Sequence, residues 1–200
     1  GGNRFDLATF CYMPQCWTSD NTDPLDRMYI QSGTSYGYPQ SVMTMHVAAQ
    51  YSFANFRPSS IEHRFNVSAF GLLGYELDVT RIPESDRNEI PGQIEMFKKF
   101  NPLVRTGDQD RIGNVFEDNM WDAWMFVAKD KSEAVFTFVQ VLGRPNYGSR
   151  RIKLKGLDPD RKYRNSENGQ VHTGAALMNC GINVSLHGDF ASKVIHFTAE

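Results

Sequence analysis

The hydrophobic period of this chain changes part-way along its 200 residues. Up to about Asp108 apolar residues recur at helical spacing, with short apolar runs between, which is typical of helices alternating with buried strands. Beyond that point residues 121–127 alternate in character, and residues 134–142 form a β-branched and aromatic run. Short strands separated by Gly, Pro, Asn and Asp are typical of an antiparallel sandwich. The sequence therefore predicts an α/β region over residues 1–110 and an all-β domain, an antiparallel β-sandwich, over residues 111–200.

The two regions divide further into short elements, whose ends are marked mainly by Gly, Pro and polar residues. In the first region the expected elements are a buried strand over 7–17, a helix over 24–32 that ends at Gly33, a short strand or irregular link over 36–47, a loop over 50–60, a helix over 60–77 and a helix over 84–100. Pro91-Gly92 in the last helix requires either that tertiary contacts override propensity or that the helix kinks. In the second region strands are also expected over 134–142, 152–156, 162–164 and 193–198.

An acidic turn follows the first predicted strand. Trp17 precedes residues 18–23, which carry two carboxylates, Asp20 and Asp23, and Pro24 comes next. A carboxyl group in an apolar pocket walled by an aromatic ring has a raised pKa and can donate its proton to a glycosidic oxygen. Trp17 could supply that wall. The same residues also match a helix N-cap followed by Pro in the first turn, and this second interpretation stays open.

Several sequence blocks occur together in one known family. The blocks are GGNRFD (1–6), PQCWTSDNTD (14–23), Arg27, IQSGTSY (30–36), Tyr38-Pro39, Met43, MHV (45–47), FGLLGYELD (70–78) and GAALMNCG (174–181). In these blocks the chain resembles the C-terminal part of glycoside hydrolase family 36, the retaining α-galactosidases. The resemblance implies the C-terminal portion of a (β/α)8 TIM barrel, an α/β fold, followed by the β-sandwich domain.

The resemblance also implies roles for individual residues. Asp20 stands at the position of the family's general acid/base, and Gly1 stands at a glycine whose backbone contacts sugar. Together with the Trp17 wall, this predicts Asp20 as catalytic and Gly1 and Trp17 as substrate-binding residues. The family's nucleophilic Asp and a sugar-contacting Cys lie upstream of Gly1, so we expect the chain by itself to be inactive.

A retaining glycosidase needs two carboxyl groups about 5 Å apart. Asp6 is expected to lie at the far end of the predicted strand, since a strand rises roughly 3.3 Å per residue. Asp23 more plausibly orients backbone groups or Arg27. The aromatic residues of the 50–60 loop line a substrate mouth or, as the favoured alternative, pack on the barrel rim.

Composition limits the partners. The formal net charge is −2, with acids and bases interspersed, so no nucleic acid and no membrane surface is expected as a partner. Three cysteines do not make a disulfide framework, which favours a reducing, cytoplasmic compartment. The five histidines and three cysteines lack metal-ligand spacing, so neither a metal nor a cofactor is expected.

Three functions remain open at this stage. The chain is part of an α-galactosidase that hydrolyses terminal α-galactosides of oligosaccharides, a non-catalytic carbohydrate-binding or assembly module, or part of a relative that transfers galactose to another sugar. A partial barrel would expose strand edges, so we expect a homo-oligomer or association with an N-terminal portion.

Overall fold

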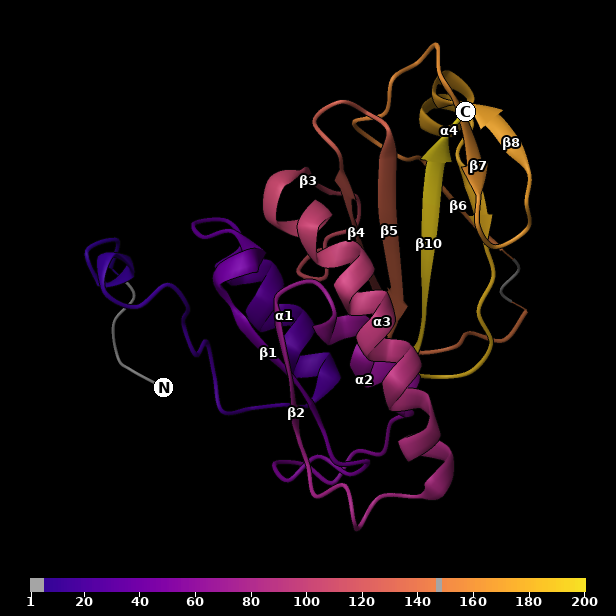
Figure 1. Cartoon of the computed structure of the whole chain (residues 1–200). Helices are drawn as coiled ribbons and strands as arrows, with labels where there is room; N and C mark the ends of the chain where they lie inside the picture. Colours follow the sequence, from indigo (N-terminus) through magenta and orange to yellow (C-terminus); the bar gives the residue numbers. More distant parts are fainter. Residues whose placement is uncertain (1–5, 147–148) are drawn as a thin grey trace. The chain divides into compact units, whose positions relative to one another are not determined.

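The computed structural model describes residues 6–146 and 149–200 (Figure 1). The chain divides into two compact units, Gly1–Asn101 and Pro102–Glu200. The division falls within helix α3 (Glu84–Thr106). This helix confirms the prediction over 84–100 and continues six residues further.

The first unit alternates parallel strands with helices. Cys16 forms a parallel bridge with Met43, and β1 (Thr44–Ala48), which follows directly, pairs in parallel with β2 (Leu72–Glu76). Figure 1 shows β1 and β2 side by side. Helix α1 (Pro24–Thr34) and the short 3-10 helix η2 (Gln40–Val42) connect Cys16 to β1, and helix α2 (Ile61–Ser68) connects β1 to β2. Parallel strands joined through helices are the pattern expected for the end of a (β/α)8 barrel.

The predicted strand over residues 7–17 is wrong except near its end. Thr9–Cys11 form a 3-10 helix, η1, and Leu7 and Tyr12 are 75% and 89% exposed. Asp6 stabilises this turn, because its side-chain Oδ1 and its backbone carbonyl each accept a hydrogen bond of 3.0 Å from the Thr9 amide. An apolar and aromatic composition was therefore not enough to make a buried strand here.

The predicted helix over residues 60–77 is wrong in its second half. Helix α2 ends at Ser68, and Leu72–Glu76 form strand β2. Gly71 allows β2 to approach β1, since a Cβ at Gly71 would lie 2.6 Å from the backbone oxygen of Met43. The run from Phe70 to Leu73 is apolar on every residue but one, a pattern that periodicity cannot assign to helix or strand.

The second unit is built on an antiparallel sheet of six strands in the order β3-β4-β5-β10-β7-β8. A two-stranded sheet, β6-β9, and helix α4 complete it. Strands β4, β5, β7 and β10 confirm predicted strands. The strand predicted over 152–156 is wrong except at Ile152, where β6 ends, and the short elements β3, β8, β9 and α4 were not predicted. The bounds are β3 (Asp108–Arg111), β4 (Trp121–Val127), β5 (Glu133–Gln140), β6 (Arg150–Ile152), β7 (Lys162–Asn165), β8 (Val171–Thr173), α4 (Gly174–Asn179), β9 (Ile182–Val184) and β10 (Ala191–Ala199).

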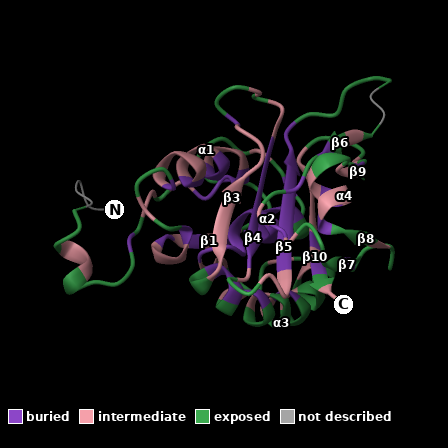
Figure 2. Ribbon diagram, turned by 90° about the horizontal axis from the view of Figure 1, so that it is seen from above, coloured by how far each residue is buried: buried purple, intermediate pink, exposed green. Residues whose placement is uncertain are grey.

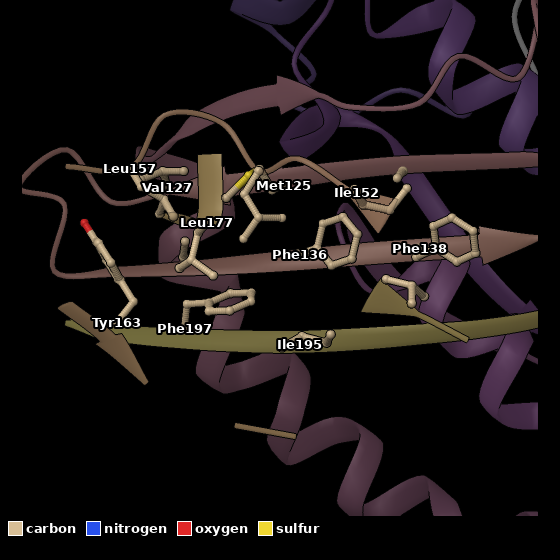
Figure 3. Packing of buried hydrophobic residues seen from close by; sticks show 14 residues of the cluster. Met125, Val127, Phe136, Phe138, Ile152, Leu157, Tyr163, Leu177, Ile195 and Phe197 are labelled. Atoms are coloured by element: carbon tan, nitrogen blue, oxygen red, sulfur yellow. The ribbon is translucent and has the colours of Figure 1, made fainter. Parts of the chain in front are cut away.

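The core of the second unit lies between the large sheet and the shorter elements (Figure 3). Met125, Phe136 and Phe197 of the sheet belong to one buried cluster with Ile152 of β6 and Leu177 of α4. Strand β5 is buried along nearly its whole length (Figure 2). The second layer of the predicted sandwich is therefore a small one, made by β6, β9, α4 and the loops beside them.

Candidate active site

The acidic turn follows the first parallel segment of the barrel end. Asp20 comes four residues after Cys16, whose bridge to Met43 places this segment beside β1. In (β/α)8 barrels the residues that do chemistry lie at the C-terminal ends of the parallel strands. Asp20 itself is exposed, whereas Thr22 and Asp23 beyond it are buried.

Side chains within the turn hold its shape. The Ser19 hydroxyl accepts the Asn21 amide at 3.1 Å, and Asn21 Oδ1 accepts the Asp23 amide at 3.0 Å. Asn21 also donates from Nδ2 to Asp26 Oδ2 at 2.7 Å. The backbone on the C-terminal side of Asp20 is thus fixed by local hydrogen bonds typical of Asx and Ser turns.

Asp23 is the N-cap of helix α1. Its Oδ1 accepts the backbone amides of Leu25 and Asp26 at 3.0 and 3.1 Å, and Pro24 occupies the first helical position. The N-cap interpretation of the turn is confirmed, with Asp23 as the cap. Asp20, three residues before the cap, is exposed, and its role as an acid stays a prediction.

Arg57 forms an ion pair with the fully buried Asp23. The prediction that Asp23 orients backbone amides is confirmed, but the expected partner Arg27 is wrong, since the cation at Asp23 is Arg57. Asp23 Oδ2 is buried and has no hydrogen-bond partner in the described part of the chain, so the carboxylate depends on its Oδ1 contacts.

Arg27 instead supports the N-terminal side of the turn. It donates to Thr18 Oγ1 at 2.9 Å, to the Thr44 carbonyl at 3.0 Å and to the Ser19 carbonyl at 3.4 Å, and its Nε donates to Gln31 at 3.1 Å. Burial lowers the pKa of Arg27 to about 10, which still leaves it charged at neutral pH. Arg27 therefore ties the segment before Asp20 to the start of β1.

Trp17, His46 and Glu76 form a chain of contacts across three neighbouring parallel segments. The Trp17 and His46 rings meet edge to face with centroids 4.4 Å apart, and a hydrogen bond of 2.7 Å joins His46 Nδ1 to Glu76 Oε2. His46 is paired with Gly74 in the β1–β2 register, and a Cβ at Gly74 would lie 2.7 Å from the imidazole. The glycine therefore leaves the space in which His46 reaches Glu76.

The remaining predicted residues are less informative. Gly1 lies outside the described residues. Asp6 accepts from Thr9 in the exposed η1 turn. Burial raises the pKa of the Cys16 thiol. Within residues 6–146 and 149–200, no cluster of His, Cys, Asp and Glu could hold a metal ion, and no helix is long and apolar enough to cross a membrane.

Sequence reasoning missed Arg57, His46 and Glu76. The last two lie in sequence blocks that carry the family resemblance, but β2 was predicted as helix, so their common face was not recognised. Arg57 is 34 residues from Asp23 and carried no signal of its contact.

A separate hollow lies in the second unit. Its volume is about 320 Å³, and both polar and apolar side chains line it. The lining includes Arg151, Asn165, Glu167, His172 and Asn183, with Leu177 and Ile182 among the apolar residues. Asp20 belongs to the first unit, and all residues that line this hollow belong to the second.

Two family models match successive parts of the chain. The model described as Melibiase matches residues 1–107, and the model described as Glycosyl hydrolase family 36 C-terminal domain matches residues 121–197. The chain belongs to glycoside hydrolase family 36. The predicted fold class is confirmed, a barrel end followed by a β domain.

Relatives within the family are similar along the whole chain. Alpha-galactosidase Mel36A of Lactobacillus acidophilus is 39% identical over 200 residues, and alpha-galactosidase 2 of Hypocrea jecorina is 40% identical over 196 residues. These matches cover 100% and 98% of this chain but 27% and 26% of the relatives. The chain thus spans about a quarter of the length of the curated relatives it matches.

Solved structures of the family have the same fold. A variant of the α-galactosidase AgaA from Geobacillus stearothermophilus, in complex with raffinose, superposes with a TM-score of 0.96 at 38% identity and covers 100% of this chain and 28% of that one. Another variant of AgaA, in complex with stachyose, gives a TM-score of 0.96 at 39% identity and likewise covers 100% of this chain and 28% of that one.

Proposed function

We propose that this chain forms the acid/base-carrying part of a retaining α-galactosidase, with Asp20 as the general acid/base and the nucleophilic carboxylate supplied by the rest of the polypeptide. The proposal rests on the way in which neighbouring side chains hold the turn that carries Asp20. This residue is an exposed carboxyl group at the C-terminal end of a parallel segment, with Arg27 holding one side of its turn and the Asp23 cap holding the other.

In this mechanism Asp20 acts twice. It donates a proton to the glycosidic oxygen as the nucleophile displaces the leaving group, and it later takes a proton from the water that releases galactose. Trp17, 36% exposed and held against His46, would wall the galactose site, and the backbone of Gly1 would contact the sugar. An isolated chain with Asp20 and no nucleophile would be inactive.

The experiment is Asp20→Asn in the full-length polypeptide. Hydrolysis of raffinose, whose leaving group needs protonation, should fall about 100- to 10,000-fold in kcat/KM, the range that general acid catalysis supplies. A nitrophenyl α-galactoside, with its good leaving group, should still galactosylate the enzyme. Added azide, which needs no general base, should then restore turnover and yield α-galactosyl azide.

Asp26→Asn is the matched control, because it changes a second carboxyl group of the same segment whose acceptor role towards Asn21 an amide oxygen can keep. It should hydrolyse both substrates within about twofold of wild type, a change well under 1.4 kcal/mol. Loss of activity in Asp26→Asn but not in Asp20→Asn would reject Asp20 as the acid/base.

Carbohydrate binding by the second unit is a second candidate function, favoured by its polar hollow. A hollow of about 320 Å³ is near the lower end of ligand-site volumes, and side-chain amides such as Asn165 and Asn183 suit sugar hydroxyls. Binding of an α-galactan to full-length Asp20→Asn that is lost in Asn183→Ala would support it. Unchanged binding would remove it.

We also propose that this chain assembles with the rest of its polypeptide or with a second copy. Among the described residues, β2 has one strand partner, β1, and an open edge of this kind is normally covered. Sedimentation of the 200-residue chain at increasing concentration should show self-association. A monomer throughout would reject the second copy and leave the rest of the polypeptide as the partner.

A further inference from the structure

Residues 51–58 form a closed loop after the C-terminal end of β1, named here the aromatic loop. Tyr51 and Pro58 form an antiparallel bridge, and the Ser59 amide donates to the Gln50 carbonyl at 3.1 Å. Inside it, the Ser52 amide donates to the Arg57 carbonyl at 3.1 Å, and the Phe56 amide donates to the Ser52 carbonyl at 2.8 Å. The loop therefore has a defined backbone with its own hydrogen bonds.

The aromatic side chains of this loop face solvent. Tyr51, Phe53 and Phe56 are 59%, 65% and 77% exposed, so they do not pack against the described residues of this chain. Phe56 has a φ of 57°, in the left-handed region that bulky residues rarely adopt. Such a conformation persists where the surrounding structure imposes it, and it is found most often at functional sites.

Arg57 connects the aromatic loop to the turn of Asp20. The arginine follows Phe56 directly and forms the ion pair with Asp23, the cap three residues after Asp20. The loop and the turn also follow neighbouring parallel segments, β1 and the Cys16 bridge, at the ends where barrel enzymes bind substrate. The ion pair thus holds three exposed aromatic residues at a set place relative to the acid/base.

We propose that the aromatic loop is the subsite for the leaving-group sugars of an oligosaccharide α-galactoside. Aromatic side chains offer large, rigid apolar faces, which suit the C–H faces of pyranose rings. Residues 51–56 carry no charge, which matches a neutral ligand. This inference rests on the proposed function, because the site it extends is that of Asp20.

The test compares a substrate that has a leaving-group sugar with one that has none. Raffinose carries sugars beyond the scissile bond, whereas α-galactosyl fluoride carries a single atom. The variant is Phe53→Ala with Phe56→Asn in the full-length polypeptide, since Asn accepts a left-handed backbone. The control is Tyr36→Ala, which removes an aromatic residue, 64% exposed, from the segment that precedes β1.

In the double variant, kcat/KM for raffinose should fall about tenfold or more while kcat/KM for α-galactosyl fluoride stays within about twofold. Tyr36→Ala should change neither. An equal fall on both substrates, or no fall on raffinose, overturns the inference. A fall on both substrates together with a smaller sedimentation coefficient would instead assign the loop to contact with a second copy. A wild-type enzyme that cleaves neither substrate would reject the proposed function and the inference with it.

Discussion

The ion pair between Arg57 and Asp23 should be the main support of the turn that carries Asp20. Arg57→Met removes the guanidinium and leaves a carboxylate that is 0% exposed, with Oδ1 still accepting the amides of Leu25 and Asp26. Removing one partner of a fully buried pair costs about 3–5 kcal/mol, and a single charge-assisted hydrogen bond contributes about 1.5–3 kcal/mol. Because the two hydrogen bonds of the cap remain and Arg57 is partly exposed, we expect the free energy of local opening of the cap to fall by about 2–3 kcal/mol.

The matching assay is hydrogen exchange at the Leu25 and Asp26 amides, which reports local opening of the cap. At 1.4 kcal/mol per tenfold change, exchange there should become about 30- to 150-fold faster in Arg57→Met. Arg87→Met, which removes an exposed arginine of α3, should leave both amides unchanged. Asp23→Asn combined with Arg57→Met should recover part of the loss, since a neutral amide costs less to bury. Unchanged exchange in Arg57→Met would refute the reasoning.

Four further substitutions test the two units. Gly71→Ala places a Cβ against the Met43 carbonyl, which cannot move away, so the free energy of unfolding should fall by about 2 kcal/mol or more. Gly74→Ala places its Cβ against the His46 ring, so it should lower stability less while breaking the bond between His46 and Glu76. Thermal unfolding measures the first effect, and the NMR shifts of the imidazole measure the second. Tyr163→Phe removes a buried hydroxyl that donates to Lys131 O at 2.9 Å and accepts from Asp158 N at 3.1 Å, so the second unit should lose about 1–3 kcal/mol in denaturant unfolding. Burial, with a smaller effect of Arg64, lowers the pKa of His63 to about 4, so unfolded chains bind a proton that folded chains do not between pH 6.5 and 4. Stability should therefore fall as the pH is lowered through that window, and His63→Leu should flatten the profile of Tm against pH; an identical profile would contradict this.

The sequence predicted the elements that are encoded locally. Helix α1 begins where Asp23 and Pro24 place its cap and first residue, and β5 is a run of β-branched and aromatic residues that suits a central strand. The strand over 7–17 was wrong because Thr9–Cys11 form a 3-10 helix and the apolar residues Leu7 and Tyr12 beside it are exposed. The second half of the helix over 60–77 was wrong for a different reason. Apolar composition indicates burial but not the partner, and the partner of β2 is β1, 28 residues away in the paired register.

The same distinction applies to the candidate site. Asp20 and Trp17 could be chosen from one short segment, because their residue types and spacing are visible there. The contacts between Arg57 and Asp23 and between His46 and Glu76 join residues 34 and 30 positions apart. The contact between His46 and Glu76 follows from the register of the parallel strands β1 and β2, whereas the contact between Arg57 and Asp23 joins a loop to a helix cap. A single sequence reveals neither arrangement.

The supports of the turn explain how an exposed carboxyl group can be held in place. In the proposed mechanism Asp20 must reach a glycosidic oxygen within hydrogen-bond distance, and a displacement of about 1 Å can cost two orders of magnitude in rate. Solvent-facing side chains are rarely fixed by packing, so the backbone on either side contributes to the constraint. Arg27 holds Thr18 and Ser19, while Asp23, itself held by Arg57, begins a helix three residues later. Arg27 and Arg57 can therefore govern the rate without touching substrate, so substituting either should lower kcat more than it raises KM.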